Sequence, residues 1–343
     1  MNAVLCYCRA GFENECALEL DAVAASHSIK GQSRFDANTA FVAFETSSDE
    51  RALRDAFVWR DLIFARQCVI AFAHLRDLPR ADRLTPILAS IESRGELFND
   101  VWTEAPDSDE GKALAPLCKS FGNALIGALR QRGRIDANAP RRLHVFFPKG
   151  DTVFLAASDD STSAPWPLGI PRLKFPREAP SRSTLKLEEA FLVLLSAAER
   201  ERWLKPGMSA VDLGASPGGW TWQLVHRSIR TTAIDNGPMD RALMQSGIVT
   251  HLREDGFRYR PRKAVDWLVC DMVEQPKRIA ALIAGWLRDG ACRYAMFNLK
   301  LPMKKRYDET RACLDIVRAA ALDVRARQLF HDREEITAFA RAR

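Results

Sequence analysis

The segment DLGASPGGW at residues 212–220 constrains this chain more than any other stretch, because it holds three glycines and one proline before its first bulky side chain, Trp220. A short apolar run precedes it from Met208, and residues 220–226 contain no helix breaker. The pattern therefore predicts a strand, a glycine turn and a helix. Such a turn lets the backbone approach a ligand closely, beside the free N–H groups of a helix N-terminus. A plain glycine-rich turn is the alternative.

The chain has 343 residues, of which 47% are hydrophobic, so we expect at least two domains with substantial cores. We find no apolar run long enough for a membrane span and no secretory leader pattern, and we expect a cytoplasmic protein with no membrane partner. The eight cysteines are scattered without a CxxC pair, which is typical of reduced, buried thiols. Cys6 and Cys8 lack further ligands at suitable spacing, so no metal site is expected.

The formal charge of +6 is distributed unevenly. Residues 1–50 carry three basic and eight acidic side chains, whereas residues 251–343 carry twenty basic and thirteen acidic ones. A polyanion would therefore prefer the C-terminal part. This excess of basic side chains is more typical of a protein that binds a nucleic acid than of one that binds a small neutral substrate.

Five prolines in residues 158–180 mark the clearest boundary in the chain. Upstream, alternating patterns predict two small α+β modules, residues 1–80 and 81–160. The predicted strands are 3–10, 39–45, 64–72, 97–106, 141–148 and 152–158, and the predicted helices are 12–26, 49–57, 82–93 and 114–133. A linker is expected over residues 161–180, followed by a third domain over 181–343.

Helical and strand patterns alternate in residues 181–343, which predicts an α/β fold with a doubly wound, mainly parallel sheet. The expected strands are 208–214, 230–235, 249–255, 265–272 and 293–299, the expected helices are 186–204, 219–229, 239–247, 276–288 and 307–322, and a hairpin ends the chain.

The residues at the strand ends are of interest because ligands of such sheets bind beyond the carboxyl ends of the strands. After the glycine loop, the next four strands end at Asp235, Asp255, Asp271 and Lys300. An acidic residue about 20 positions beyond the loop can accept hydrogen bonds from both ribose hydroxyls of a nucleoside. A nicotinamide dinucleotide would favour GxGxxG, which this loop lacks. S-adenosylmethionine has no phosphate to bind and suits GASPGG better.

DLGASPGGW resembles the first motif of the ribose 2'-O-methyltransferases related to the heat-shock 23S rRNA methyltransferase. SRSTLKLEEA, VCDM, FNLK and HDREE follow in the order of that family, over about 160 residues. Together with GFENECALEL, FFPKGD and FNLKLPMKKRYDE, the whole chain resembles bacterial enzymes that methylate a cytidine ribose of 23S rRNA. The resemblance implies a Rossmann-like catalytic domain behind a ferredoxin-like module and an RNA-binding THUMP module. It also implies 23S rRNA, free or in a large-subunit precursor, as the partner.

The same resemblance implies a catalytic tetrad of Lys186, Asp271, Lys300 and Glu334. Methylation of a ribose hydroxyl requires such residue types, because the hydroxyl is a poor nucleophile at pH 7 and needs a base. Lys300 is the candidate base, and burial or the neighbouring cation Lys186 would have to lower its pKa. Glu335 is the alternative to Glu334, since a one-residue shift in a strand moves a side chain to the other face.

The cofactor residues carried over from the family share a place in the glycine loop, in the turn before residue 184 or at a strand end. They are Ser183, Ser216, Pro217, Gly218, Gly219, Asp235, Asp255 and Asp271. Within this set, Asp255 is expected to meet the adenine amino group.

Two basic groups are candidates for RNA phosphates, with solvated positive charges as the alternative. The first is Arg130, Arg132, Arg134, Arg141, Arg142 and Lys149, and the second is the KKRY segment at 304–307. A base methyltransferase acting on rRNA or tRNA is a competing function, although alternation turns Cys270 inward and Asp271 lacks the following prolines. A noncatalytic ribosome-assembly factor is another, but Asp235 and Lys300 are both present.

Overall fold

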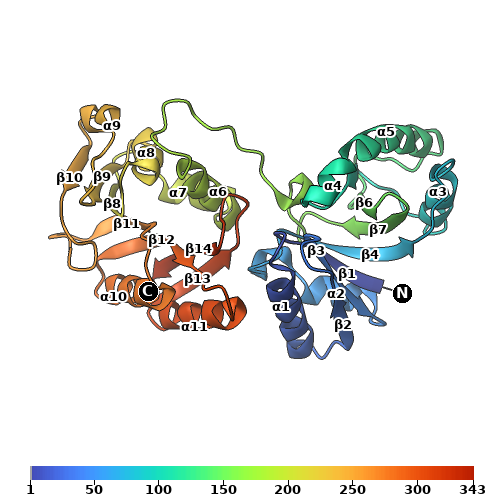
Figure 1. Cartoon of the computed structure of the whole chain (residues 1–343), viewed down its shortest axis with the longest axis horizontal. Helices are drawn as coiled ribbons and strands as arrows, with labels where there is room; N and C mark the ends of the chain where they lie inside the picture. Colours follow the sequence, from blue (N-terminus) through green and yellow to red (C-terminus); the bar gives the residue numbers. More distant parts are fainter. Residues whose placement is uncertain (1) are drawn as a thin grey trace. The chain divides into compact units, whose positions relative to one another are not determined.

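The computed structural model describes residues 2–343, which form two compact units that meet in the sequence at Pro171 and Arg172 (Figure 1). Each unit is built on a seven-stranded sheet of its own. In the described part of the chain, no helix is long and apolar enough to cross a membrane.

The first unit joins both predicted small modules in one continuous sheet with the order β2-β3-β1-β4-β7-β6-β5. Its strands are β1 (Asn2–Tyr7), β2 (Gly31–Arg34), β3 (Phe41–Thr46), β4 (Gln67–Leu75), β5 (Val101–Glu104), β6 (Arg142–Lys149) and β7 (Thr152–Ser158). Its helices are α1 (Glu13–Ser26), α2 (Glu50–Ala56), α3 (Leu84–Glu92), α4 (Asp109–Ala113) and α5 (Ala115–Gln131), with 3-10 turns η1 (Trp59–Asp61) and η2 (Pro167–Gly169). Antiparallel pairing of β4 with β7 connects the two modules.

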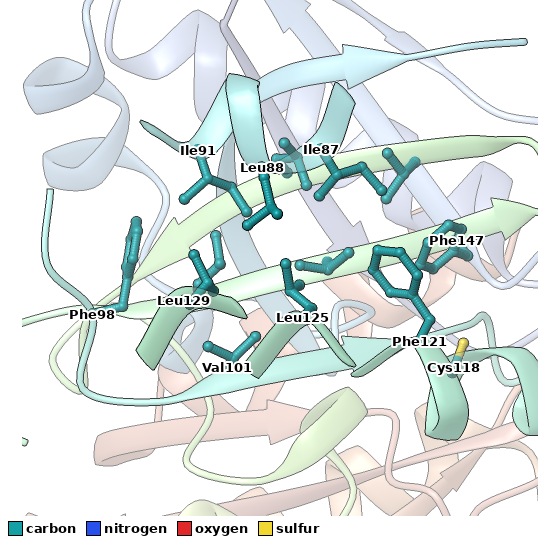
Figure 2. Close-up of a cluster of buried hydrophobic side chains, with 14 of the residues drawn as sticks. Ile87, Leu88, Ile91, Phe98, Val101, Cys118, Phe121, Leu125, Leu129 and Phe147 are labelled. Carbon is teal, nitrogen blue, oxygen red and sulfur yellow. The ribbon is translucent and has the colours of Figure 1, made fainter. Parts of the chain in front are cut away.

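Alternation along the strands places two apolar layers on opposite faces of this sheet. In β7, Leu155 belongs to a core cluster with α3 and α5, while Phe154 belongs to a different cluster with β1 and β3. Figure 2 shows the first of these clusters, where Phe121, Leu125 and Leu129 recur at helical spacing along α5. The helix is thereby fixed on the sheet by its apolar side.

The second unit has the strand order β10-β9-β8-β11-β12-β14-β13. Its strands are β8 (Ser209–Leu213), β9 (Arg230–Ile234), β10 (Val249–Leu252), β11 (Val265–Cys270), β12 (Cys292–Lys300), β13 (Ala321–Arg327) and β14 (Glu335–Ala342). Its helices are α6 (Thr184–Leu194), α7 (Ala197–Trp203), α8 (Gly219–His226), α9 (Arg241–Gln245), α10 (Pro276–Arg288) and α11 (Arg306–Arg318).

The strands β8 to β12 pair in parallel, and β14 pairs antiparallel with both β12 and β13. The chain first builds outward from β8 to β10 and then returns to continue from β11 on the other side of β8. The predicted α/β doubly wound fold is confirmed. Because the winding reverses between β8 and β11, a crevice opens at the carboxyl ends of these two neighbours.

Four of the five predicted helices of the second unit were too long, and two of them have a clear cause. The helix expected over 186–204 is interrupted between α6 and α7, where Ser196 accepts a hydrogen bond from the Glu199 amide and the Glu199 carboxylate accepts one from the Ser196 amide. This capping box starts a new helix. The helix expected over 307–322 ends at Arg318, because residues from Ala321 onward pair with β14.

Candidate active site

Two lysines and two carboxylates meet where β11, β12 and β14 come together. Asp271 directly follows β11, Lys300 ends β12, and Lys186 lies in the first turn of α6. Glu335 begins β14 and is paired in register with Lys300. The Lys186 Nζ lies 2.5 Å from Glu335 Oε1 and 3.6 Å from Asp271 Oδ2, and the Lys300 Nζ lies 2.8 Å from Asp271 Oδ1. Lys300 also pairs with Glu335, which closes a ring of alternating charges.

The ring is largely shielded from solvent, and its charges stabilise one another. Exposed fractions are 24% for the Lys300 side chain and 5% for that of Glu335. Burial disfavours the charged amine of Lys300, but attraction to Asp271 and Glu335 and hydrogen bonds to both outweigh it, so the pKa of Lys300 lies above its usual value. The expected lowering of this pKa is therefore not seen in the ring itself.

The choice of Glu334 for the tetrad needs correction. The Glu334 side chain is 62% exposed and pairs with Arg306 at 3.4 Å, outside the ring. Glu335 takes the inner position because it pairs with Lys300 across the ladder between β12 and β14. Neighbouring residues of a strand point to opposite faces, so the register decides between them.

A buried polar layer lies directly behind Asp271. The amide nitrogen of Asn298 donates to Asp271 Oδ1 at 2.8 Å, and the amide oxygen of Asn298 faces the Thr337 hydroxyl at 2.7 Å. The same hydroxyl lies 3.0 Å from both carboxyl oxygens of Asp332. The sequence analysis assigned no role to Asn298, Thr337 or Asp332, although alternation along β12 places Asn298 on the same face as Lys300.

A pocket of about 570 Å³ opens beside the ring, at the carboxyl ends of β8, β9 and β11. Four of the predicted cofactor residues, Ser216, Asp235, Asp255 and Asp271, contribute to its lining. Glu254 and Glu274 add two further acidic side chains, and no basic residue stands among the described lining residues. An acidic pocket favours a ligand with a positive centre and disfavours a pyrophosphate.

Glycines at and beside the pocket allow neighbouring segments to pack closely in its wall. A Cβ at Gly214, where φ is +78°, would lie 2.7 Å from Met272 Cγ, and one at Gly237 would lie 2.6 Å from Ser216 Oγ. Gly219 serves packing instead, because its Cβ would lie 2.1 Å from Ser183 Oγ in the turn before α6. The loop thus makes two close approaches to the rest of the protein, one at Gly214 to Met272 after β11 and one at Gly219 to the turn before α6.

The predicted residues Ser183, Pro217, Gly218 and Gly219 do not contribute to the pocket lining. Gly218, with φ of +118°, is the N-cap of α8, and Pro217 accepts a hydrogen bond from the Asp240 amide. These residues shape the loop and the start of the helix.

Asp235 is held firmly at the end of β9. Its carboxylate accepts hydrogen bonds from the Ser216 amide at 3.0 Å and from the Gly237 amide at 2.7 Å, one at each oxygen. Each oxygen keeps a second lone pair for a ligand hydroxyl. Asp255 accepts from the Phe257 amide at 2.8 Å and is half exposed at the pocket.

Asp212, in the strand β8 beneath the loop, is a further residue that sequence reasoning did not single out. It is fully buried and accepts a hydrogen bond from the Thr221 hydroxyl at 2.7 Å. Burial raises its pKa to about 7, the Thr221 hydrogen bond opposes this rise, and the neighbouring charges of Asp271 and Asp235 add to it. The aspartate that opens DLGASPGG was the available sequence signal.

Half of the predicted basic cluster in the first unit is already paired with acidic side chains. Arg141 contacts Glu50 and Glu96, and Arg132 pairs with Glu92 at 2.8 Å. The guanidinium of Arg142 lies over the Trp102 ring at 3.8 Å, with Asp100 and Asp160 nearby. Of the three other members, Arg134 is half-buried, and Arg130 and Lys149 are exposed and accessible to a polyanion. In the second basic segment, Lys304 and Lys305 are exposed.

Comparison with known proteins gives matches along most of the chain. Residues 1–69 match the RlmM ferredoxin-like domain, residues 82–159 match the N-terminal part of ribosomal RNA large subunit methyltransferase M, and residues 179–320 match the FtsJ-like methyltransferases. Proteins named ribosomal RNA large subunit methyltransferase M from Xanthomonas campestris pv. campestris (strain B100) and Xanthomonas oryzae pv. oryzae (strain PXO99A) are each 54% identical, with 99% of both chains covered. The chain belongs to this methyltransferase family.

The protein is therefore an rRNA methyltransferase, and S-adenosylmethionine is its methyl donor. The acidic pocket fits that donor, which carries a positive sulfonium. Among solved structures, TrmN from Thermus thermophilus aligns with 99% of this chain and 100% of its own, at 16% identity and a TM-score of 0.38. Fibrillarin from Methanococcus jannaschii aligns with 57% and 80%, at 12% identity and a TM-score of 0.35. These similarities are too low to add to the assignment.

Proposed function

We propose that this enzyme methylates the 2'-hydroxyl of a cytidine ribose in 23S rRNA, with Lys186, Asp271, Lys300 and Glu335 as its catalytic group. The observation that carries the proposal is the charge ring beside the acidic pocket, in which Asp271 belongs to both. A methyl donor in the pocket would thus lie next to a buried lysine. The sequence resemblance supports cytidine and 23S rRNA.

Lys300 is the proposed general base. The hydroxyl oxygen forms a bond to the methyl carbon, the carbon–sulfur bond breaks, and the hydroxyl proton passes to the neutral Lys300 amine. S-adenosylmethionine supplies the methyl group together with a positive charge, which opposes protonation of a nearby amine. Asp271 orients that amine through its 2.8 Å contact, while Lys186 and Glu335 hold the ring in place.

Asp235 is the proposed ligand of the cofactor ribose and Asp255 that of the adenine amino group. Both line the pocket, and the backbone donors that hold Asp235 leave lone pairs directed to a ligand. Gly214 lets the loop pack against Met272, which also lines the pocket.

Base methylation is less well supported. Methylation at cytosine C5 needs a cysteine thiolate, but Cys270 is fully buried, and burial raises its pKa to about 12.

Lys304 and Lys305 in the exposed segment after β12 support the binding of RNA phosphates there. The THUMP assignment of residues 81–160 and the domain limits stay predictions.

The test is to incubate the full chain with labelled S-adenosylmethionine and 23S rRNA from cells that lack this enzyme. We expect label on one cytidine, at a position that becomes resistant to alkaline cleavage because the 2'-hydroxyl is blocked. The same RNA already methylated at that site serves as the control and should take up no label. Label on a base, or a site that remains sensitive to alkali, would contradict ribose methylation.

A further inference from the structure

The polar layer behind Asp271 contains one hydroxyl that faces more acceptors than it can serve. Thr337 lies 2.7 Å from the amide oxygen of Asn298 and 3.0 Å from both carboxyl oxygens of Asp332. A threonine hydroxyl has a single hydrogen to donate. All three side chains are buried, so an unmade hydrogen bond here is costly.

The donors in this layer can be assigned from their partners. The Asp271 carboxylate only accepts, so the nitrogen of Asn298 must face it at 2.8 Å, and its oxygen must face Thr337. The single hydrogen of Thr337 therefore goes to Asn298. The remaining contact with Asp332 joins two oxygens without a hydrogen unless Asp332 carries one.

We propose that Asp332 is held as a neutral acid that donates to Thr337, and that the chain from Asp332 through Thr337 and Asn298 fixes the orientation of Asp271 for methyl transfer. These three are positioning residues, and the inference rests on the proposed function of the charge ring. The Leu329 amide donates to Asp332 Oδ2 at 3.0 Å, so the acid is held in place from a second side.

The surroundings of Asp332 favour its neutral form. Burial is the main cause that raises its pKa well above the usual range, and the negative charges of Glu335 in β14 and Glu189 in α6 add to it. Lys186 opposes the rise but does not cancel it. The Leu329 amide also stabilises the charged form, to a smaller extent than burial disfavours it.

The protonation state of Asp332 affects the position of the Lys300 amine through Asp271. Asn298 and Lys300 both contact Oδ1 of Asp271, which leaves Oδ2 for Lys186. If Asp332 were ionised, the Thr337 hydroxyl would donate its hydrogen to Asp332 instead of Asn298. The Asn298 amide oxygen would then lose its hydrogen bond from Thr337. Asp271 would then be free to rotate, and the amine of Lys300 would lose its fixed position.

The kinetic test uses the full chain and unmethylated 23S rRNA. We expect Thr337→Val to lower kcat about 5- to 30-fold, the effect of one lost buried hydrogen bond, with the KM values for RNA and cofactor within twofold of wild type. Thr337→Ser should restore kcat. The matched control is Thr310→Val, because the buried Thr310 hydroxyl in α11 has no hydrogen-bond partner and lies outside the site.

Asp332 is tested by a pair of variants that separates a neutral acid from a carboxylate. The amide of Asp332→Asn can donate to Thr337 and accept from Leu329, so we expect it to keep most of the activity, whereas Asp332→Ala should lose as much as Thr337→Val. A wild-type kcat in Thr337→Val would overturn the proposal. Equal losses in both Asp332 variants would do the same, since they would show that the carboxylate is required.

A second measurement does not depend on activity. In the full chain labelled with ¹³C-aspartate, the carboxyl resonance missing from Asp332→Asn belongs to Asp332. We expect it at the position of a protonated acid at pH 7, and titration near its ordinary value of about 4 would overturn the proposal. If the wild-type enzyme makes no 2'-O-methyl ribose, the proposed function fails, while the state of Asp332 is still decided here.

Discussion

Lys300 is surrounded by two carboxylates that stabilise its ammonium form, yet a general base must be neutral when the hydroxyl proton arrives. Both requirements can be satisfied if a ligand with a positive charge binds in the neighbouring pocket. That charge opposes the effect of the two carboxylates and lowers the pKa of the Lys300 amine. In the proposed mechanism, the two carboxylates hold the Lys300 amine in place before the reaction, and the neutral amine accepts the hydroxyl proton during it.

Replacing Lys300 tests this role directly. We expect Lys300→Ala to lower the single-turnover rate of methyl transfer by about 10² to 10⁴, the usual contribution of a positioned base, with nearly unchanged cofactor affinity. Lys300→Arg should not restore the rate, because a guanidinium stays protonated. The rate is measured at saturating RNA. A fast arginine variant would make Lys300 an RNA contact and would leave the base unidentified.

The raised pKa of Lys300 predicts the direction in which the rate of methyl transfer changes with pH. Below that pKa the neutral fraction of the amine grows about tenfold for each pH unit, so we expect the single-turnover rate to rise from about pH 7 to pH 9. The Lys300→Ala variant should lose this rise. Cofactor and RNA saturation are checked at each pH. A wild-type rate that stays constant over this range would count against an amine base.

In the proposed site, Asp235 is expected to contribute to the affinity for the cofactor. We expect Asp235→Ala to weaken S-adenosylmethionine binding at least tenfold, because both proposed ribose contacts and both backbone hydrogen bonds vanish together. Titration calorimetry on the full chain measures the Kd. The exposed Asp289 at the end of α10 provides the control variant Asp289→Ala. Unchanged affinity in Asp235→Ala would remove this residue from the site.

At the scale of elements, the site depends on how strands end and on which residue begins the next one. The succession of strands along the chain and the residues Asp235, Asp271 and Lys300 at their ends follow from sequence patterns alone, because buried parallel strands leave a strong apolar signal. Sequence patterns alone do not decide between Glu334 and Glu335. The choice depends on the register of β14 against β12, which is a contact between segments about 35 residues apart in the chain.

The other departures have the same origin in local or tertiary contacts. The SxxE pattern at Ser196 was visible, but the apolar periodicity of residues 186–204 continues across it and conceals the break. Asp332 and Thr337 could not be joined to the site from sequence, because only folding brings them behind Asp271. The pairing of β4 with β7, which unites two modules, is likewise invisible in local patterns.

The element α7 is tied to the edge strand β13 by an ion pair that can be tested by pH. The Arg325 side chain donates to both Glu199 oxygens at 2.8 and 2.7 Å, and this pairing lowers the pKa of Glu199 to about 2. The folded-state pKa lies below the unfolded one, so the stabilisation is present above about pH 4.5 and is lost as pH falls towards 2.

We therefore expect Glu199→Gln to lower the free energy of unfolding at pH 7 by about 1 to 2 kcal/mol, with solvent screening taken into account. At pH 3 the difference from wild type should shrink. Urea unfolding at both pH values measures it. The exposed acid Glu201 in the same helix gives the matched control Glu201→Gln, expected to stay near wild type. An equal loss at both pH values would mean that the ion pair does not titrate in this range.

At the scale of the whole molecule, we propose that the two units divide methyl transfer and RNA binding between them. The second unit contains the charge ring and the acidic pocket, and each unit has its own sheet and core. The pocket carries several acidic side chains and would repel RNA phosphates unless basic residues elsewhere offset them. Lys304 and Lys305 offer some of this charge, and Arg130 and Lys149 of the first unit offer more.

Separating the units tests this division. We expect residues 172–343 alone to bind S-adenosylmethionine with nearly the affinity of the full chain, because the pocket lies wholly within them. Their kcat/KM for 23S rRNA should be lower, and its dependence on salt weaker, since fewer phosphate contacts release fewer counterions. In the full chain, Arg130→Glu combined with Lys149→Glu should reproduce part of the loss without changing cofactor affinity. Calorimetry confirms that the isolated unit is folded and competent for the cofactor. Full activity of that unit on rRNA would show that the first unit is not needed to hold the RNA.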